Sequence, residues 1–529
     1  MSLKRLSDDK FGFLLLTSAV VLGGWMRLSL PAQTQFPIGD GGLFYKMIET
    51  LQNNNFALPL YVTYNNIDIP FAYPPLALYL AAWLGKTFHL SILSILTWMP
   101  AIVLTIAILL FYMLSNLFLK SRLQAGLASL IYALTPRSTT WLIMGGGITR
   151  SVGHLLQILA LSQIYLLFKT GQQKYLFSSI LFSTGICLSH PEATLHTAGI
   201  AALLWFFYGR NRQGFLNACL VGLGTLAITA PWWVTVMSRF GLDAYIAAMQ
   251  TGRGHIPSAF IMAFLLPYNG ESLLTTILLF SLIGLLLKIK QKDFFLPSFF
   301  VLPFILEPRN APNVYILPMA MLASIFITEF LLPGLEQEVK IAESTPAFSI
   351  RWRIVVMTYL LIALFSSMVF SSLKLIEQNT VSPDMRMTAE WIRKNTPPSS
   401  RILLISGEMN LLSDFDNEWL PLLTNRTSLT TIQGTEWLPN FVFQTRSKQN
   451  ETLQTCLSAD EPYLCIQEIF PRKDFDYILV KHRAKYTSRL IYSLIEADDL
   501  LPVYSSKDAI VFERKQPRKT DTAYAASPR

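Results

Sequence analysis

The first residue that could do chemistry is an aspartate in the segment F-P-I-G-D-G-G-L-F, residues 36–44. Asp40 follows the first apolar block of the chain, and its flanking glycines allow a tight turn that leaves the carboxylate accessible. Such a carboxylate can act as a general base that takes a proton from an attacking hydroxyl group. It can also cap the N-terminus of a helix that begins near Leu43, and local spacing alone favours this structural role over the catalytic one.

A second pair of candidates lies in S-H-P-E-A-T-L-H, residues 189–196, where Pro191 separates two apolar segments. His190 and Glu192, with His196 downstream, could bind a metal ion or position an acceptor hydroxyl. A hydrated loop end is the alternative interpretation, because a single His-x-Glu pair is a weak metal signal.

Three arginines complete the candidate site. Arg150 follows G-G-G-I-T, Arg253 lies near His255 in T-G-R-G-H, and Arg309 lies in L-E-P-R-N-A-P. Guanidinium groups bind phosphate through paired hydrogen bonds, so an anionic lipid-linked ligand would explain all three arginines. The alternatives are a local pair with Glu307 for Arg309 and an exposed loop for Arg253.

The composition predicts that these residues are positioned by membrane-spanning helices. The chain is 52% hydrophobic and 15% charged, and its apolar residues fall in long blocks. A helix needs about 20 apolar residues to cross the hydrocarbon core. The qualifying blocks are Phe11–Leu30, Ile92–Leu119, Leu123–Met144, Leu155–Phe168 and Leu273–Leu287. The first block has no small-residue cleavage site, so we expect a retained helix and not a signal peptide.

The distribution of basic residues predicts the orientation of the helices. Most lysines and arginines lie in the short links between apolar blocks, so the net charge of +9 reports topology and not a nucleic-acid partner. Placing these links in the cytoplasm gives about eleven spans and a cytoplasmic N-terminus. The outer loops are then 31–90, 136–150, a short one near His190, 238–272 and the segment around 307–312. All the candidate residues fall in or beside these loops.

The first outer loop and the C-terminal region carry further structure. Leu43–Leu51 has helical spacing, and Tyr73–Leu84, which opens Y-P-P-L, reads as a helix lying in the membrane interface. Beyond the last span, 354–372, residues 374–515 are expected to form a small extracytoplasmic soluble α/β domain. Its predicted strands and helices are 401–406, 477–481, 509–514, 387–394 and 486–497.

Two smaller expectations concern the same region. Cys456 and Cys465 lie close together in the polar domain and could pair in an oxidising compartment. Residues 516–529 are predicted to be a disordered tail.

The combination of an aspartate in G-D-G-G-L-F-Y-K, the Y-P-P-L helix, many spans and a C-terminal outer domain resembles the GT-C superfamily of membrane glycosyltransferases. This group includes protein O-mannosyltransferases, lipid A aminoarabinose transferases and oligosaccharyltransferase catalytic subunits. The motifs lie in residues 36–86, and the architecture covers the whole chain. Other segments are similar to uncharacterised bacterial members, which implies a bacterial inner (plasma) membrane location.

The resemblance implies an α-helical polytopic membrane protein with a catalytic module over residues 1–373. It also implies inverting transfer of a hexosyl or pentosyl group from a polyprenyl-phosphate donor to a glycan, lipid or protein acceptor. Asp40 would be the general base or a metal-positioning group, with His190 or Glu192 assisting. Arg150 and Arg309 would steady the leaving phosphate, a charge-stabilising role.

Residues that complete the expected substrate site are Arg253, His255 and Tyr73. A divalent metal, Mg²⁺ or Mn²⁺, is a candidate cofactor, with Asp40 and Glu192 as its ligands. The chain departs from the family pattern in two places. Gly41 stands where protein mannosyltransferases carry a second acidic residue, and the second outer loop lacks the acidic pair that oligosaccharyltransferases use for a metal.

Two other functional classes remain open at this stage. A transporter or flippase of lipid-linked glycans predicts ionisable residues at the midplane of spans and internal symmetry. The sequence shows neither, since its charges lie at span ends. A catalytically inactive membrane scaffold predicts that Asp40, His190, Glu192 and Arg309 lie far apart.

Overall fold

The computed structural model describes residues 8–251, 274–335, 347–482 and 487–515. The chain folds into two compact units. The first comprises Met1–Leu60 and Pro70–Thr380, and the second comprises Tyr61–Ile69 and Val381–Arg529.

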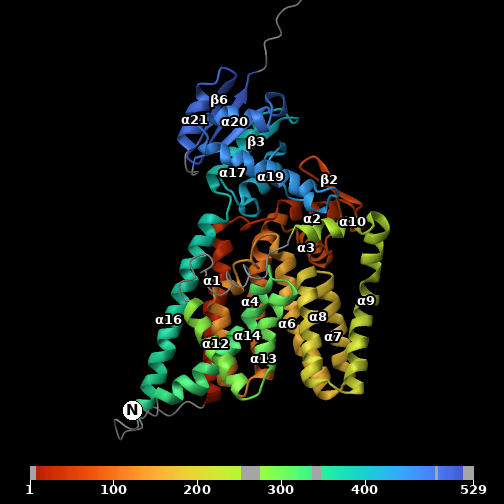
Figure 1. Cartoon of the computed structure of the whole chain (residues 1–529), viewed down its shortest axis with the longest axis vertical. Coiled ribbons are helices and arrows are strands. Elements are labelled where there is room, and N and C mark those ends of the chain that lie inside the picture. Colours follow the sequence, from red (N-terminus) through yellow and green to blue (C-terminus); the bar gives the residue numbers. More distant parts are fainter. Residues whose placement is uncertain (1–7, 252–273, 336–346, 483–486, 516–529) are drawn as a thin grey trace, which may run out of the picture. The chain divides into compact units, whose positions relative to one another are not determined.

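The first unit is helical (Figure 1). Its α-helices are α1 (Asp8–Thr34), α2 (Gly42–Asn53), α3 (Leu76–Phe88), α4 (Ile92–Phe118), α5 (Arg122–Leu134), α6 (Gly147–Thr170), α7 (Gln173–Cys187), α8 (Pro191–Tyr208), α9 (Arg212–Phe240), α10 (Asp243–Gln250), α12 (Leu274–Lys290), α13 (Phe295–Leu306), α14 (Ala311–Phe326) and α16 (Ala347–Gln378). A 3₁₀ turn, η1 (Pro136–Ser138), follows α5, and a short π-helical segment, η3 (Ile327–Leu331), extends α14.

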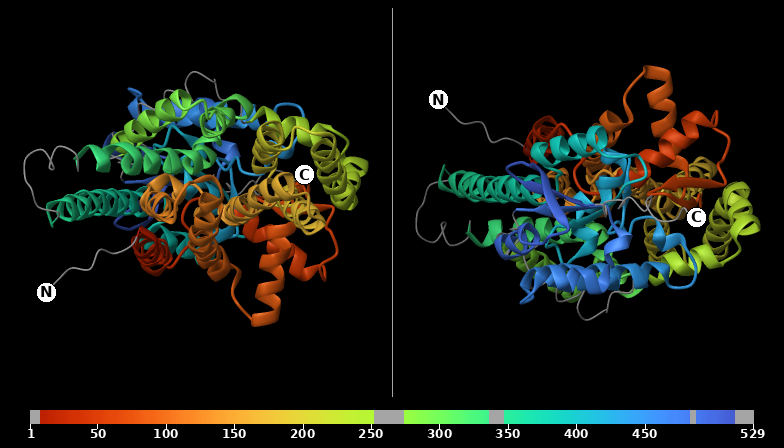
Figure 2. Two further views of the ribbon diagram at one scale, coloured as in Figure 1. Left: turned by 90° about the horizontal axis from the view of Figure 1, so that it is seen from below. Right: turned by 90° about the horizontal axis from the view of Figure 1, so that it is seen from above.

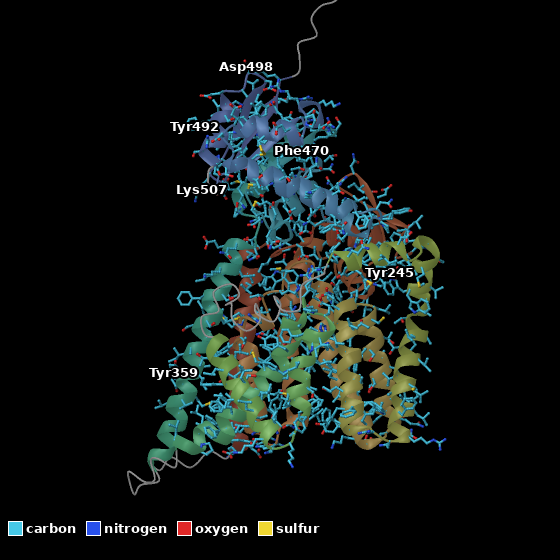
Figure 3. The ribbon with its side chains drawn as sticks, viewed as in Figure 1. Tyr245, Tyr359, Phe470, Tyr492, Asp498 and Lys507 are labelled. Carbon is cyan, nitrogen blue, oxygen red and sulfur yellow. A yellow bond between two sulfur atoms is a disulfide. The ribbon has the colours of Figure 1, made fainter. Side chains whose placement is uncertain are left out.

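Six stretches of the described residues are helical, long and apolar enough to cross a membrane. They are Asp8–Thr34, Ile92–Phe118, Gly147–Thr170, Arg212–Phe240, Ala311–Leu335 and Ile354–Asn395. Large apolar side chains on α9 and α16 are exposed, as expected of surfaces that face lipid. Tyr359, for example, projects outward from α16 and is 62% exposed (Figure 3). These features support an integral membrane protein; the expected count of about eleven spans stays a prediction.

The core of the first unit lies where α1, α4, α5, α6 and α14 pack together, and the end-on views show these helices side by side (Figure 2). α1 and α5 approach closely at two glycines: a Cβ on Gly126 would lie 2.2 Å from the carbonyl oxygen of Gly12. Small residues at such crossings let helix backbones touch, which is how helices associate in lipid.

Two sequence predictions in this unit need correction. The apolar block Leu123–Met144 is not one helix, because α5 ends at Leu134 and the chain turns through η1. Pro136 explains the break, since a proline disfavours helical conformation in the residue before it. The interfacial helix α3 begins at Leu76, later than the predicted Tyr73, and Pro75 is its N-cap.

The second unit is an α/β unit with a five-stranded sheet in the order β4-β3-β5-β7-β6. The strands are β3 (Arg401–Ile405), β4 (Thr427–Ser428), β5 (Tyr477–Lys481), β6 (Leu500–Ser505) and β7 (Ala509–Arg514). β4, β3 and β5 run parallel, whereas β7 pairs antiparallel with β5, and β6 antiparallel with β7. The α-helices are α17 (Pro383–Asn395), α18 (Phe415–Thr424), α19 (Val442–Thr455), α20 (Pro462–Ile469) and α21 (Thr487–Ile495).

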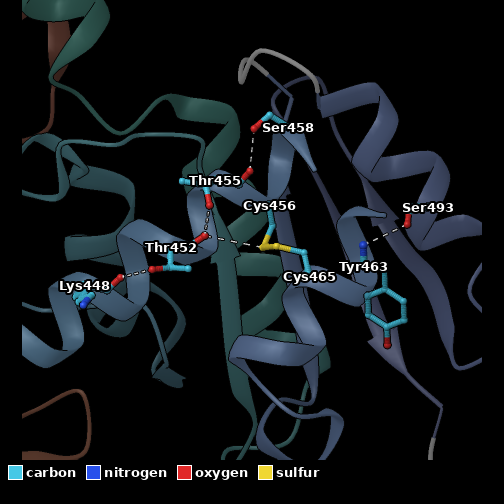
Figure 4. The surroundings of a disulfide bond; sticks show 8 residues. All are labelled: Lys448, Thr452, Thr455, Cys456, Ser458, Tyr463, Cys465 and Ser493. Atoms are coloured by element: carbon cyan, nitrogen blue, oxygen red, sulfur yellow. Dashed lines mark hydrogen bonds between the residues drawn. A yellow bond between two sulfur atoms is a disulfide. The ribbon is translucent and has the colours of Figure 1, made fainter. Parts of the chain in front are cut away.

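Strands β3, β5 and β7 confirm the three predicted strands, whereas β4 and β6 were missed. The predicted tail, 516–529, lies outside the described residues. The suggested pairing of Cys456 with Cys465 is confirmed: a disulfide joins the segment after α19 to α20 (Figure 4).

A β-hairpin from the first outer loop belongs to the second unit. Strands β1 (Tyr61–Tyr64) and β2 (Ile67–Pro70) are joined by Asn65 and Asn66, both at positive φ. The Asn65 amide donates to the carbonyl of Ser428 at 2.8 Å and accepts from its N–H at 2.7 Å. One side chain thereby forms a backbone-like pair with β4.

Candidate functional site

Asp40 forms the centre of the site through an ion pair with Arg150. Nη2 of Arg150 lies 2.7 Å from Oδ2 of Asp40, and the two side chains are 13% and 22% exposed. Oδ1 of Asp40 is buried and accepts no hydrogen bond from any residue that the structure describes. The N-cap of α2 is Gly41, and no side chain caps this helix. The cap interpretation of Asp40 is therefore wrong.

The glycines before Arg150 allow this pair to form. The loop carrying Asp40 is bound to the segment before α6 by two backbone hydrogen bonds, from Gly145 to Ile38 and from Gly146 to Asp40. A Cβ on Gly145 would lie 2.4 Å from the carbonyl oxygen of Asp40. A Cβ on Gly146 would lie 2.7 Å from Oδ2 of Asp40 and from the ring of Phe44. The G-G-G run is thus required for close approach of two backbones.

Arg150 is fixed on a second side by the residues that precede it. Its guanidinium lies 4.3 Å from the centre of the Trp141 ring, and its Nη1 donates to the Trp141 carbonyl at 3.3 Å. A cation over an indole face is attracted by the ring quadrupole. Arg150 therefore has little freedom to leave Asp40.

Tyr73 lies beside the same charges. Its hydroxyl is 3.2 Å from the hydroxyl of Thr149, and its ring meets Phe44 edge to face. Burial raises the pKa of Tyr73 to about 12, Arg150 lowers it, and the carboxylates of Glu192 and Asp40 raise it. Tyr73 is thus a neutral hydrogen-bonding group at physiological pH.

Arg150 also lines a small polar cavity between α6, α8 and α14. The cavity has a volume of about 10 Å³, which is room for about one water molecule. It is lined by Leu142, Arg150, His154, Gln157, His190, Ala193, Asn310, Asn313 and Val314. Most of these side chains are polar, which suits a site for a polar ligand group.

His190 and Glu192 lie at the start of α8. His190 is the N-cap, its Nδ1 accepting from the Ala193 N–H at 3.4 Å, so its Nε2 carries the proton of the neutral ring. Burial lowers the pKa of His190 to about 4, the Glu192 carboxylate partly offsets this, and Arg150 and Arg309 lower it further. The buried His190 is not a hydrated loop end.

Glu192 is half-buried in the first turn of α8. Its carboxylate makes no hydrogen bond or ion pair with the residues that the structure describes, yet its charge acts on its neighbours. Burial raises the pKa of Glu307, and the Glu192 carboxylate raises it further. The charge of Glu192 therefore raises the pKa of two neighbours, His190 and Glu307, and Glu307 lies in the turn before α14.

Arg309 lies in that turn, next to the cavity. The Glu307 carboxylate accepts hydrogen bonds from the backbone N–H groups of Arg309 and Asn310, at 3.0 and 2.7 Å. Glu307 thus binds the backbone of Arg309, and the expected local pair of their side chains is absent among the described residues. The exposed guanidinium stands at the N-terminus of α14, where a helix favours anions.

Four polar residues of the cavity were not predicted from the sequence. His154 and Gln157 follow Arg150 at helical spacing, i+4 and i+7, which places all three on one face of α6. That spacing could have predicted from the sequence that His154 and Gln157 lie near Arg150. Asn310 and Asn313 stand beside Arg309 and lack any motif of their own. Arg253 and His255 lie outside the described residues.

The residues present do not fit the expected divalent metal. Such an ion takes about six oxygen ligands, and the described part of the chain contains no group of three or more His, Cys, Asp or Glu that could hold one. Oδ2 of Asp40 is already bound to Arg150. His196 donates from Nε2 to the carbonyl of Pro303 at 3.2 Å, and its Nδ1 is buried without a hydrogen-bond partner among the described residues.

Comparison with known proteins identifies the fold. No protein-family profile and no curated protein sequence matches the chain. Its structure is similar to the oligosaccharyltransferase AglB of Archaeoglobus fulgidus, with a TM-score of 0.60 and 13% identity over 89% of this chain and 69% of that one. It is also similar to ArnT of Cupriavidus metallidurans, with a TM-score of 0.55 and 11% identity over 94% and 97% of the two chains. The fold is that of the GT-C glycosyltransferases.

A third GT-C enzyme, the mycobacterial arabinofuranosyltransferase AftD, has a TM-score of 0.56 and 14% identity. It matches over 97% of this chain but only 40% of its own. The GT-C likeness confirms the resemblance that the G-D-G-G-L-F-Y-K and Y-P-P-L motifs indicated. The bacterial branch of the family stays a prediction.

Proposed function

We propose that this chain is a membrane glycosyltransferase that moves a sugar from a polyprenyl-phosphate donor to an acceptor outside the cytoplasm. The observation that carries the proposal is the Asp40–Arg150 pair beside a polar cavity in a GT-C fold. The neighbours support the donor class: ArnT was solved with undecaprenyl phosphate, and AglB with a dolichol-phosphate and an inhibitory peptide. The acceptor is a group with a proton to lose, as on a glycan, lipid or protein.

Asp40 acts as the general base in this proposal. Its carboxylate takes the proton of the acceptor as the acceptor atom bonds to the anomeric carbon of the sugar. The bond from that carbon to the phosphate oxygen breaks, and polyprenyl phosphate leaves with the electron pair. Attack opposite the leaving group inverts the anomeric centre. Oδ1 of Asp40, which accepts no hydrogen bond from described residues, has capacity for the incoming proton.

Arg309 binds the phosphate. It is exposed, lies at the N-terminus of α14 and is free of any ion pair within the described residues, so its donors are available to an anion. Charge that develops on the leaving phosphate is stabilised by donors already in place, which lowers the barrier without reorganisation.

The remaining candidates position the reactants. The pKa of His190, about 4, keeps its ring neutral, so Nε2–H can donate to a sugar or acceptor hydroxyl across the physiological range. Glu192 assists as a second acceptor of hydrogen bonds, and Tyr73 donates through its hydroxyl. The roles of Arg253 and His255 in binding the donor stay predictions.

The proposal is tested with the purified full-length chain in lipid vesicles. It is supplied with radiolabelled polyprenyl-phosphate sugars, hexosyl and pentosyl, together with membranes of the source cells as acceptor. We expect at least one donor to be consumed, with release of free polyprenyl phosphate and transfer of the label. Label that crosses the vesicle bilayer still attached to its lipid would instead support a flippase. If every donor stays intact and in place, the transferase proposal is wrong.

A further inference from the structure

The counter-ion of the Asp40 carboxylate is a side chain of the protein itself. Arg150 donates to its Oδ2 at 2.7 Å, and both side chains are largely buried. Arg150 is also held from behind by the ring and the carbonyl of Trp141. Three separate features of the chain produce this arrangement: the glycines that bring the backbones together, the first turn of α6 and the indole face.

A divalent ion would compete with this guanidinium for the same oxygen. Two positive charges about 4 Å apart repel strongly where solvent is largely excluded. Displacing Arg150 would also leave a buried guanidinium without its partner, which is strongly destabilising. Metal binding at Asp40 therefore opposes both electrostatics and packing.

Within the described residues, other ligands that could outweigh this cost are not assembled. Nδ1 of His190 accepts the Ala193 N–H, and the described residues contain no group of three or more His, Cys, Asp or Glu that could hold a metal ion. Among the described residues, Glu192 is a second carboxylate whose charge acts on Tyr73, the neighbour of Asp40, and on His190. Two carboxylates, one already paired, leave most positions around a divalent ion to water.

We infer that Arg150 is the fixed counter-ion of Asp40 and stands where a metal ion would otherwise be bound, so that sugar transfer by this chain needs no divalent cation. Arg150 is a positioning residue: it orients the base and supplies a permanent positive charge beside it. The statement about sugar transfer rests on the proposed function, whereas the exclusion of metal from Asp40 does not. The exclusion of metal from Asp40 can be measured without any substrate.

The test is a titration of the full-length protein in detergent with MnCl₂, followed by electron paramagnetic resonance of free Mn²⁺. We expect wild type and Asp40→Asn to give superimposable curves. One additional ion bound by wild type with a Kd below about 100 μM, and lost in Asp40→Asn, overturns the inference.

The Arg150→Gln variant tests the cause of the exclusion. Removal of the positive charge should raise the affinity for Mn²⁺ by about tenfold or more, a change of about 1.4 kcal/mol. That gain should vanish in the double variant with Asp40→Asn, while Arg150→Lys, which keeps the charge, should titrate like wild type. An Arg150→Gln curve identical to wild type would show that Arg150 does not keep the metal away. Thermal unfolding confirms that each variant is folded.

Activity provides a separate readout. With a donor that the wild type consumes, kcat/KM in EDTA and in Mn²⁺ should agree within about twofold, a difference below 0.5 kcal/mol. Loss of turnover in EDTA that Mn²⁺ restores would contradict the inference. Absence of transfer under every condition would count against the proposed function alone, because the Mn²⁺ titration needs no turnover.

Discussion

At the scale of single residues, the two arginines of the site differ: Arg150 is ion-paired, whereas the guanidinium of Arg309 is exposed. Asp40 and Arg150 neutralise each other at 2.7 Å. Arg309 differs because Glu307 binds its backbone N–H and not its guanidinium, which stays exposed at the start of α14. In the proposed mechanism the two arginines therefore differ: Arg150 pairs with the base, and Arg309 is available to an anionic ligand.

The change Arg309→Ala should therefore weaken donor binding. Loss of a charge-assisted hydrogen bond costs about 1.5–3 kcal/mol, so KM for the lipid-phosphate donor should rise about tenfold to a hundredfold. Arg309→Lys should recover part of the loss, since it keeps the charge but not the fork of donors. Initial rates over a range of donor concentrations measure this. Arg210→Ala, an exposed arginine between α8 and α9, is the control, and equal KM changes in both variants would refute the phosphate role.

Part of the site could be predicted from the sequence, from the residue types and from their places in the expected outer loops. Asp40, His190 and Arg150 could be chosen because ionisable groups beside membrane spans are costly unless used. The pairing of Asp40 with Arg150 could not be foreseen, since 110 residues separate them and the contact depends on how two loops meet. Asn310 and Asn313 were missed because uncharged amides carry no such cost signal.

At the scale of elements, the site depends on the segment between η1 and α6. Gly145 and Gly146 lie against the Asp40 loop: a side chain at Gly146 would occupy the space of the carboxylate, and one at Gly145 would meet the backbone carbonyl of Asp40. The backbone conformation of Gly146 is ordinary, with φ of −60°, so its small size and not its flexibility is what the site uses.

Gly146→Ala should therefore reduce activity without unfolding the protein. The added Cβ would lie 2.7 Å from Oδ2 of Asp40 and must displace it. Misplacement of a catalytic group by about 1 Å costs on the order of a hundredfold in rate. Gly222→Ala is the matched control, because a Cβ at Gly222 in α9 meets nothing within 4 Å. Equal transfer rates for the two variants would show that the close approach is irrelevant to catalysis.

In the second unit, a buried polar network follows strand β3. The carboxylate of Asp414, the N-cap of α18, accepts from Ser406 at 2.6 Å and also from Asn417. Burial raises the pKa of Asp414 to about 6 from an ordinary 3.8, while the hydrogen bond from Ser406 opposes the rise. The folded unit therefore keeps this proton to a higher pH than the unfolded chain does.

This difference predicts a pH dependence of stability. Between pH 3.8 and about 6 the folded state binds more protons than the unfolded state, so the contribution of Asp414 to stability is greatest at low pH and falls as pH rises. Hydrogen exchange of the β3 amides in the full-length chain, corrected for intrinsic rates, measures it. Asp414→Asn should flatten the pH dependence over this window, and an unchanged profile would contradict the prediction.

The same unit shows which elements a sequence reveals. Continuous apolar runs predicted β3 and β5, since strands buried on both faces read in this way. β4 has only two residues, and β6 has a mostly exposed pattern broken by Pro502, so neither gives a clear period. The hairpin β1–β2 did carry a signal, because Asn65-Asn66 between two short β-type runs suits a turn with positive φ.

At the scale of the whole molecule, the lengths of the apolar blocks and the basic links between them predict the topology. Six described stretches are long enough to span a membrane, and the shorter apolar helices α3 and α13 are not. The predicted helix over Leu123–Met144 was too long, because Pro136 interrupts this apolar block. Orientation is predicted from the lysines and arginines of the links, which a fold alone does not reveal.

The predicted orientation places the N-terminus in the cytoplasm and the second unit outside. Alkaline phosphatase, which folds only in an oxidising compartment, should be active when fused to the C-terminus of the full-length chain. The same enzyme fused before residue 1 should be inactive. The Cys456–Cys465 disulfide is consistent with this compartment. Activity of the N-terminal fusion, or inactivity of the C-terminal one at equal expression, would reverse the assignment.

The central claim is that Asp40 takes the proton during transfer from a polyprenyl-phosphate sugar. The most direct measurement is the rate of polyprenyl phosphate release by Asp40→Asn, compared with Asp68→Asn, an exposed aspartate of the β1–β2 hairpin. Removal of a general base lowers rates by about 10²–10⁴-fold. The account predicts a loss of this size for Asp40→Asn and an unchanged rate for Asp68→Asn. Wild-type turnover by a correctly folded Asp40→Asn protein would contradict it.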